Sequence, residues 1–235
     1  MNLEQAYTAA ASTLMPQKQG TCGLYCFWYA SVLLAKINNT TSIIYPRRGQ
    51  RPTGSNAQTL RNWVKHTLRA SPNSQGEILT VQEMEDMIHA FQYQCSSSQS
   101  ATGGQNFITT SLASNRPVAI AYLHSNALPA GPVTTGTSAD CGAHWGLIYK
   151  EDTTSYTYLN PHYPNTPQVA AKQALLASSA AVDTVPLDQH WAKLPGGGLS
   201  NNPQTVNSTR FSGGTVYDLG PPRQNLQNAL VSIFI

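Results

Sequence analysis

The stretch QKQGTCGLYCFWYA, residues 17–30, holds two cysteines and leads into a segment that is apolar on nearly all sides as far as Lys36. A helix with that pattern is buried in the middle of a domain. Gly20 and Thr21 allow a tight turn just ahead of it. The sequence therefore predicts a central helix that begins at Cys22.

The two cysteines of this helix are expected to differ in reactivity. A thiol is a nucleophile only as thiolate, which is favoured at a helix N-terminus beside a histidine. Cys22 stands at the predicted helix start, and Gly23 leaves room for a substrate backbone to approach. Cys26 lies one turn further in among apolar neighbours, where a thiol stays protonated. Cys22 is thus the predicted nucleophile, and Cys26 is the alternative.

A predicted hairpin supplies the partners of the thiol. GAHWGLIY (142–149) and TYLNP (157–161) have the pattern of two antiparallel strands joined by a short turn. The start of one strand then lies beside the end of the other, so His144 and Asn160 become neighbours. Asn160 can fix the tautomer of His144 and leave its other nitrogen for the thiol. Trp145 is expected to shield this pair from water.

An amide donor for a developing oxyanion can come from just ahead of the nucleophile. Gln17, together with the backbone N–H of Cys22, is the predicted oxyanion hole, and Gln19 is the alternative. Gly23, Gly142 and Trp145 are the predicted substrate-binding residues. The polar loop of residues 125–140 is expected to border the substrate cleft.

Four motifs follow one another along the chain: Gln17-x-x-Gly20-x-Cys22-Gly23, Arg116-Pro-Val-Ala-Ile-Ala, Ala143-His144-Trp145 and Tyr158-Leu-Asn160-Pro161. Over about residues 15–165 they resemble the papain-like cysteine peptidases, above all the compact branch of bacteriocin-leader (double-glycine) peptidases and relatives. The resemblance implies an α+β papain-like fold, with a helical lobe carrying the cysteine packed on an antiparallel sheet. It implies a Cys-His-Asn triad and no cofactor. Compact members more often have aspartate before the proline, and their glutamine stands six positions ahead of the cysteine.

Three other functions use some of the same residues. A deamidase or an acyltransferase that modifies a protein target would use the same triad and thioester intermediate as a cysteine peptidase. An inactive binding module of the same fold is a third class. A tetrahedral zinc site is a further alternative, although we predict no metal; its four ligands would be Cys22, Cys26, Cys141 and His144.

Composition limits the remaining possibilities. The chain of 235 residues is 40% apolar and 11% charged, with a net charge of +3, which suits a single domain with a large core. We expect residues 1–235 to form one domain, with the catalytic core in about 15–165 and a C-terminal elaboration from about 166. No basic patch indicates nucleic acid, and no apolar run is long enough to span a membrane. The expected partner is a protein or peptide substrate. Without a signal-peptide pattern, we expect synthesis in the cytoplasm, a location compatible with later delivery into another cell.

Periodicity predicts the other elements. His124 is expected at a strand end, and His162 is expected as a loop histidine, with lining of the site as the alternative. Residues 95–105 are expected as a loop. The predicted helices are Leu3–Leu14, Ala57–Arg69, 81–91 with Thr80 and Glu83 as a capping box, Phe107–Asn115 and Gln168–Ala181, and the predicted strands are Pro117–Leu123, Ala143–Lys150, Tyr156–Asn160 and Val231–Ile235.

Overall fold

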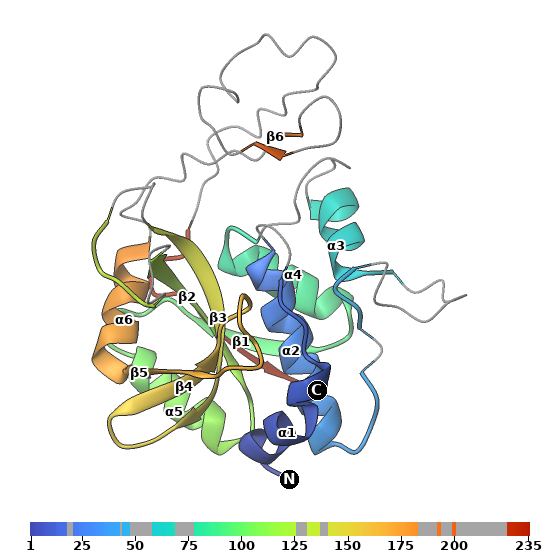
Figure 1. Ribbon diagram of the computed structural model, residues 1–235, viewed down its shortest axis with the longest axis horizontal. Helices are drawn as coiled ribbons and strands as arrows, with labels where there is room; N and C mark the ends of the chain where they lie inside the picture. Colours follow the sequence, from blue (N-terminus) through green and yellow to red (C-terminus); the bar gives the residue numbers. More distant parts are fainter. Residues whose placement is uncertain are drawn as a thin grey trace, which may run out of the picture.

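The structure, a computed structural model, describes residues 1–17, 21–42, 44–47, 58–68, 78–125, 131–136, 141–182, 192–193, 199–200 and 225–235. Its centre is a six-stranded antiparallel sheet with helices on both faces (Figure 1), which confirms the α+β class. The strand order is β1-β8-β2-β3-β4-β5. These strands are β1 (Gln94–Ser98), β8 (Leu230–Phe234), β2 (Val118–Ser125), β3 (Cys141–Glu151), β4 (Ser155–Leu159) and β5 (Gln168–Ala171).

Both faces of the sheet are buried at β2, which explains why this strand reads as a continuous apolar run. Ala119 and Ala121 face the side of α1 (Leu3–Ala10), α2 (Cys22–Ile37) and α4 (Val81–Ala90). Their small side chains let α2 pack closely on the centre of the sheet. Ile120 and Tyr122 face the side of α5 (Gly104–Ala113) and α6 (Lys172–Ala181).

The predicted central helix is confirmed. α2 begins at Cys22, runs for 16 residues, and is buried along most of its length. The predicted capping box is also present at α4, because Thr80 Oγ1 accepts from the Glu83 N–H at 3.1 Å. Within the described ranges, no helix has the length and apolar character that crossing a membrane requires.

Several boundaries differ from the predictions. The segment expected as a loop at 95–105 contains edge strand β1 and the start of α5. The helix expected at Gln168–Ala181 begins only at Lys172, because residues 168–171 pair with β4 as β5. The helix expected at Ala57–Arg69 is described as α3 (Leu60–Trp63) followed by a π-helical turn, Val64–Leu68. The helix expected from Leu3 to Leu14 ends as a 3₁₀ turn, Ala11–Thr13.

The C-terminal residues belong to the core. The predicted final strand is confirmed as β8, and it lies between β1 and β2. β5 and α6 likewise pack on the sheet, so residues after 166 are more than an elaboration of its rim. A separate pair of two-residue strands, β6 (Ala192–Lys193) and β7 (Leu199–Ser200), completes the described elements.

Candidate active site

His144 and Asn160 meet where β3 extends beyond β4. β4 ends at Leu159, opposite Leu147, so residues 141–146 of β3 have no β4 partner. The turn after β4 occupies this place and brings Asn160 Oδ1 to 3.0 Å from His144 Nε2. Both residues are buried, at 5% exposed for His144 and 0% for Asn160. Because the amide oxygen only accepts, the neutral ring carries its proton on Nε2 and a lone pair on Nδ1. The predicted proximity is confirmed.

His144 is also the middle ring of a stack of three histidines. The ring centroid of His124 lies 4.8 Å from that of His144, and the ring of His162 lies 5.0 Å away on a plane only 5° off parallel. Tyr122, directly opposite His144 in the sheet, meets it edge-on at 5.6 Å. Sequence reasoning gave no role to His124, and it kept the lining of the site by His162 only as an alternative. The available signal was alternation, since Tyr122 and His124 share one face of the strand beside the hairpin.

His144 is neutral mainly because it is buried. Burial lowers the pKa of His144 well below its usual value, and the neighbouring His124 and His162 lower it further, against the raising effect of the hydrogen bond that His144 donates to Asn160. Burial, and then His162, lowers the pKa of His124 to about 4. A neutral imidazole can accept a proton, so His144 has the protonation state of a general base at neutral pH.

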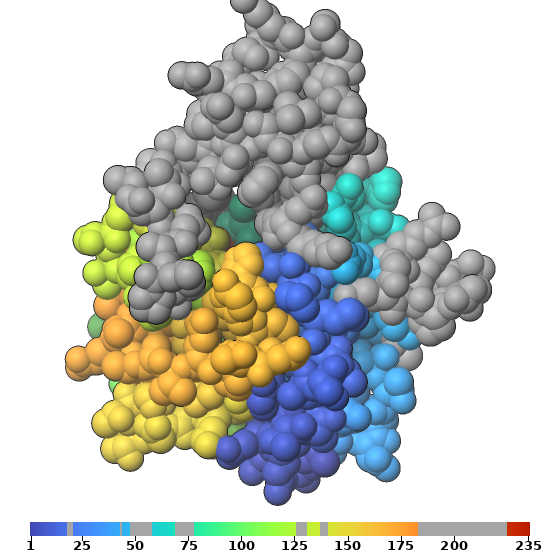
Figure 2. Space-filling view, in the orientation of Figure 1, coloured from blue at the N-terminus to red at the C-terminus, as the bar shows by residue number. Residues whose placement is uncertain are grey.

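Gln17 is held against the turn that follows Asn160. Its backbone N–H donates to Pro161 O at 2.7 Å, and its side-chain Nε2 lies 3.4 Å from His162 Nε2. Figure 2 shows the same arrangement on the surface, with the N-terminal segment (blue) against the segment after β4 (gold). Gln17 therefore lies beside the histidine stack, whereas the alternative, Gln19, falls outside the described residues.

Cys22 and Cys26 lie in different environments along α2. Cys22 is half-buried in the first turn, and Cys26 is fully buried. Burial, and then the nearby Cys22, raises the pKa of the Cys26 thiol well above its usual value. Cys26 is thus an unreactive thiol, as expected, and the alternative nucleophile is disfavoured.

At Gly23 the start of α2 packs closely against β3, which leaves no room for substrate. A Cβ on Gly23 would lie 2.8 Å from Ile78 Cβ and 3.2 Å from Trp145 Cδ1. These positions are already filled, so the expectation of an open approach at Gly23 is wrong. The glycine instead permits α2 to come close to the strand that carries His144.

Trp145 is a packing residue on the face of β3 opposite to His144. It is 1% exposed, its Nε1–H donates to Ile78 O at 3.0 Å, and it packs in the core with α2. Side chains alternate along a strand, so Trp145 points to α2 while His144 points to the side of Tyr122. The predicted substrate contact at Trp145 is therefore wrong. Gly142 remains compatible with a substrate contact, because a Cβ there would meet nothing within 4 Å.

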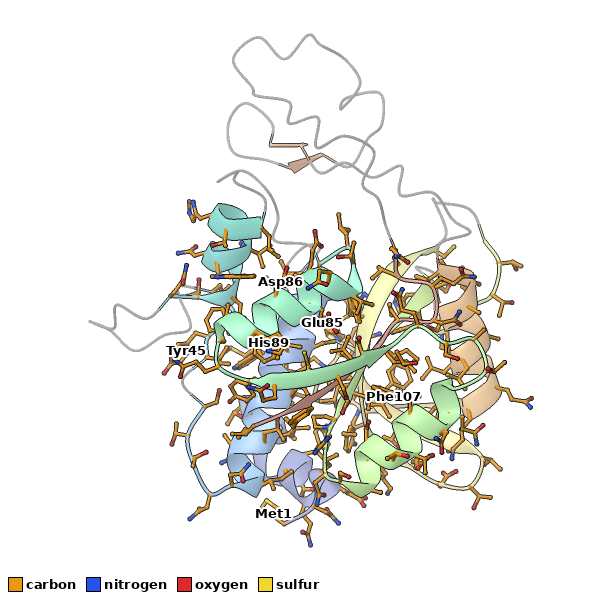
Figure 3. All side chains as sticks on the ribbon, turned by 180° about the vertical axis from the view of Figure 1, so that it is seen from behind. Met1, Tyr45, Glu85, Asp86, His89 and Phe107 are labelled. Atoms are coloured by element: carbon orange, nitrogen blue, oxygen red, sulfur yellow. The ribbon has the colours of Figure 1, made fainter. Side chains whose placement is uncertain are left out.

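A second thiol and imidazole lie together on another side of the molecule. Cys95 Sγ, on β1, is 3.5 Å from His89 Nε2, and His89 Nδ1 is 3.2 Å from Tyr93 O. Figure 3 shows His89 on α4 with Glu85 and Asp86, seen from behind. Burial and the charge of Glu85 raise the pKa of the Cys95 thiol to about 11. This pair is therefore unsuited to nucleophilic catalysis.

The zinc alternative does not fit the geometry. Its four proposed ligands all lie in the described ranges, where no group of three or more His, Cys, Asp or Glu side chains is placed to hold a metal ion. Cys141 is instead buried against Leu123 of β2.

No protein-family model matches this chain, and no curated protein sequence matches it either. The functional argument therefore rests on the geometry of the site.

Proposed function

We propose that this protein is a papain-like cysteine peptidase that hydrolyses peptide bonds of a protein substrate through Cys22, His144 and Asn160. The observation that carries the proposal is the buried hydrogen bond between His144 Nε2 and Asn160 Oδ1. A histidine held in one tautomer by a buried amide is what a general base requires.

The position of Cys22 supports its role as nucleophile. α2 is a long helix whose dipole favours a negative charge at its first residues. The first turn of α2 lies close to β3, because a Cβ on Gly23, the residue after Cys22, would fall 3.2 Å from Cδ1 of Trp145, the residue after His144. This packing places the start of α2 beside the strand that carries His144, although Trp145 and His144 point to opposite faces of that strand.

In the proposed reaction, Cys22 Sγ attacks the carbonyl carbon while His144 Nδ1 accepts the thiol proton. The negative charge that develops on the carbonyl oxygen is stabilised by Gln17 Nε2–H and the Cys22 N–H. His144 then gives its proton to the leaving amine, and a thioester on Cys22 remains. Water attacks the thioester, His144 takes a proton from it, and the acid leaves as Cys22 is regenerated.

Acylation by p-nitrophenyl acetate tests the nucleophile without knowledge of the substrate. We expect a single fast acetylation, seen as a mass increase of about 42 Da from the thioester on Cys22 and located by peptide mapping. Cys22→Ala should abolish it, and Cys95→Ala is the matched control. Fast acetylation of another residue, or none at all, contradicts the proposal.

The same thioester serves a deamidase or an acyltransferase, and target proteins distinguish these functions. Intact-mass analysis of candidate target proteins after incubation with the enzyme should give cleavage fragments for a peptidase. A shift of about +1 Da would indicate a deamidase, and a larger adduct would indicate an acyltransferase.

A further inference from the structure

The turn Asn160–His162 connects Gln17 to His144. Asn160 Oδ1 accepts from the ring of His144 and also from the backbone N–H of His162, at 2.9 Å. Pro161 O accepts from the backbone N–H of Gln17, and the ring of His162 meets the Gln17 side chain. One three-residue turn therefore contacts both the proposed base and the proposed oxyanion donor.

The ring of His162 has two contacts of different kinds. One face lies parallel to the buried ring of His144, at 5.0 Å between centroids, while His162 itself is exposed. Its edge atom Nε2 lies 3.4 Å from Gln17 Nε2. The amide nitrogen is a donor, so His162 Nε2 must act as the acceptor, with the ring proton on Nδ1. An amide nitrogen carries two hydrogens.

We propose that His162 is a positioning residue for the oxyanion hole: by accepting one hydrogen of Gln17 Nε2, it turns the other hydrogen toward the oxygen that becomes negative. This inference rests on the function proposed above. A glutamine side chain has several rotatable bonds, and fixing it before the reaction avoids that entropy loss in the transition state. Two anchors on one turn, one to the backbone and one to the side chain of Gln17, provide this restraint.

The required protonation state of His162 is consistent with its surroundings. Its Nε2 can accept only while the ring is neutral. Although the residue as a whole is exposed, desolvation of the ring stacked on its neighbours lowers the pKa of His162. The titratable side chains that face it are His144 and His124 in the stack and Tyr163, whose ring centroid lies 6.1 Å away. No carboxylate is among these contacts, so the described neighbours give no stabilising charge to an imidazolium ion.

Three substitutions separate the hydrogen bond from the ring stacking. His162→Phe keeps an aromatic ring over His144 but removes the acceptor. His162→Gln removes the ring but offers a side-chain oxygen that accepts from Gln17. His162→Ala removes both, and His66→Phe, at an exposed position on another element, is the matched control.

Two reagents report different steps at Cys22. Acetylation by p-nitrophenyl acetate passes through a tetrahedral oxyanion, whereas alkylation by iodoacetamide is a direct displacement that needs only the thiolate. We expect His162→Phe and His162→Ala to lower the acetylation rate about tenfold. Alkylation should stay within about twofold of the wild type, and His162→Gln should recover most of the acetylation rate. In a Gln17→Ala background, His162→Phe should have no further effect.

Other outcomes overturn the inference. If Gln17→Ala slows acetylation but His162→Phe does not, His162 has no role in the oxyanion hole, and the proposed function still holds. If His162→Phe keeps the acetylation rate and His162→Gln loses it, His162 acts through its stacking on His144. An equal fall of the acetylation and alkylation rates would lead to the same assignment. A Cys22 that reacts with neither reagent would overturn the proposed function and this inference together.

Discussion

Cys22 lies at the N-terminal end of one helix, α2, whereas Cys95 lies beside the C-terminal end of another, α4. Cys22 is the first residue of α2, where the backbone N–H groups point outward and the helix dipole is positive. Cys95 lies 3.5 Å from His89, in the last turn of α4, where the dipole is negative. Burial, and then the negative charge of Glu85, raise the pKa of the Cys95 thiol to about 11.

The comparison teaches that closeness of a thiol and an imidazole is a poor guide to reactivity. The pair at α4 has a short contact and even an orienting carbonyl, Tyr93 O, for its histidine. At pH 7, a thiol with a pKa of about 11 is ionised in about one molecule in ten thousand. Burial first, and then the negative charge of Glu85, keep the Cys95 thiol protonated despite its imidazole neighbour.

The largest expected effect is the difference in acetylation rate between a variant without Cys22 and a variant without Cys95. We expect Cys22→Ala to lower the rate of acetylation by p-nitrophenyl acetate about a thousandfold or more, because no other described thiol lies at a helix start. Cys95→Ala should leave the rate within about twofold. Stopped-flow release of p-nitrophenolate measures both. A large loss of acetylation rate in Cys95→Ala would show that Cys95, rather than Cys22, is the reactive thiol.

The second largest effect is expected from Asn160, which orients His144 but does not contact His89. Asn160→Ala removes the acceptor that holds His144 and should slow acetylation of Cys22 by about 10- to 100-fold. Asn160→Asp keeps the acceptor and should retain most of the rate. The same kinetic assay applies, and wild-type rates in Asn160→Ala would show that His144 needs no orienting partner.

Acid should destabilise the fold through the buried histidines. The pKa of His124 falls from 6.5 to about 4 in the folded state, so between these values the unfolded chain binds the proton and the native chain does not. The stability present above pH 6.5 is therefore lost as the pH falls toward 4, by up to about 3 kcal/mol for this residue. His144 and His162 contribute with the same sign.

Urea denaturation between pH 7 and pH 4.5 measures this loss. His124→Phe should make the free energy of unfolding less dependent on pH, and His66→Phe is the matched control on the surface. An equally steep dependence in His124→Phe would mean that His124 does not titrate differently in the folded and unfolded states.

Two glycines near the site give a smaller effect on stability. Gly23→Ala should cost about 1–3 kcal/mol of unfolding free energy, because its Cβ would fall 2.8 Å from Ile78 Cβ. Gly142→Ala, where the Cβ meets nothing within 4 Å, should stay within about 0.5 kcal/mol. Urea denaturation of both variants is the measurement. Equal stability would contradict close packing at the start of α2.

Neutralising the acid beside the second thiol should give the smallest change. Glu85→Gln lowers the pKa of the Cys95 thiol, so alkylation of Cys95 by iodoacetamide at pH 8.5 should speed up about threefold. Alkylation of Cys22, followed in the same peptide map, should not change. Equal rates of Cys95 in both proteins would leave burial as the sole cause of its raised pKa.

Local patterns in the sequence predicted several of the elements and one pair of the site. The apolar run after Cys22 predicts α2, and the capping residues of α4 bond as their spacing indicates. The short turn between two alternating strands places His144 beside Asn160, since hairpin pairing is a local geometric constraint. The papain-like resemblance and the peptidase activity remain proposals, because motifs alone do not measure the distance between a thiol and a ring.

The tertiary structure decided what depends on pairing between distant segments. β1 was missed because its polar, serine-rich sequence has little strand signal, and β8, from the far end of the chain, supplies its hydrogen bonds. The stacking of His124 and His162 on His144 requires β2, β3 and the turn after β4 to meet in one register. Gly23 and Trp145 were assigned to substrate because sequence does not reveal that Ile78 lies against both of them. The sequence by itself determined which side chains are candidates for chemistry, whereas long-range packing decided which of them touch, because side-chain contacts between distant segments are set by register and volume rather than by local propensity.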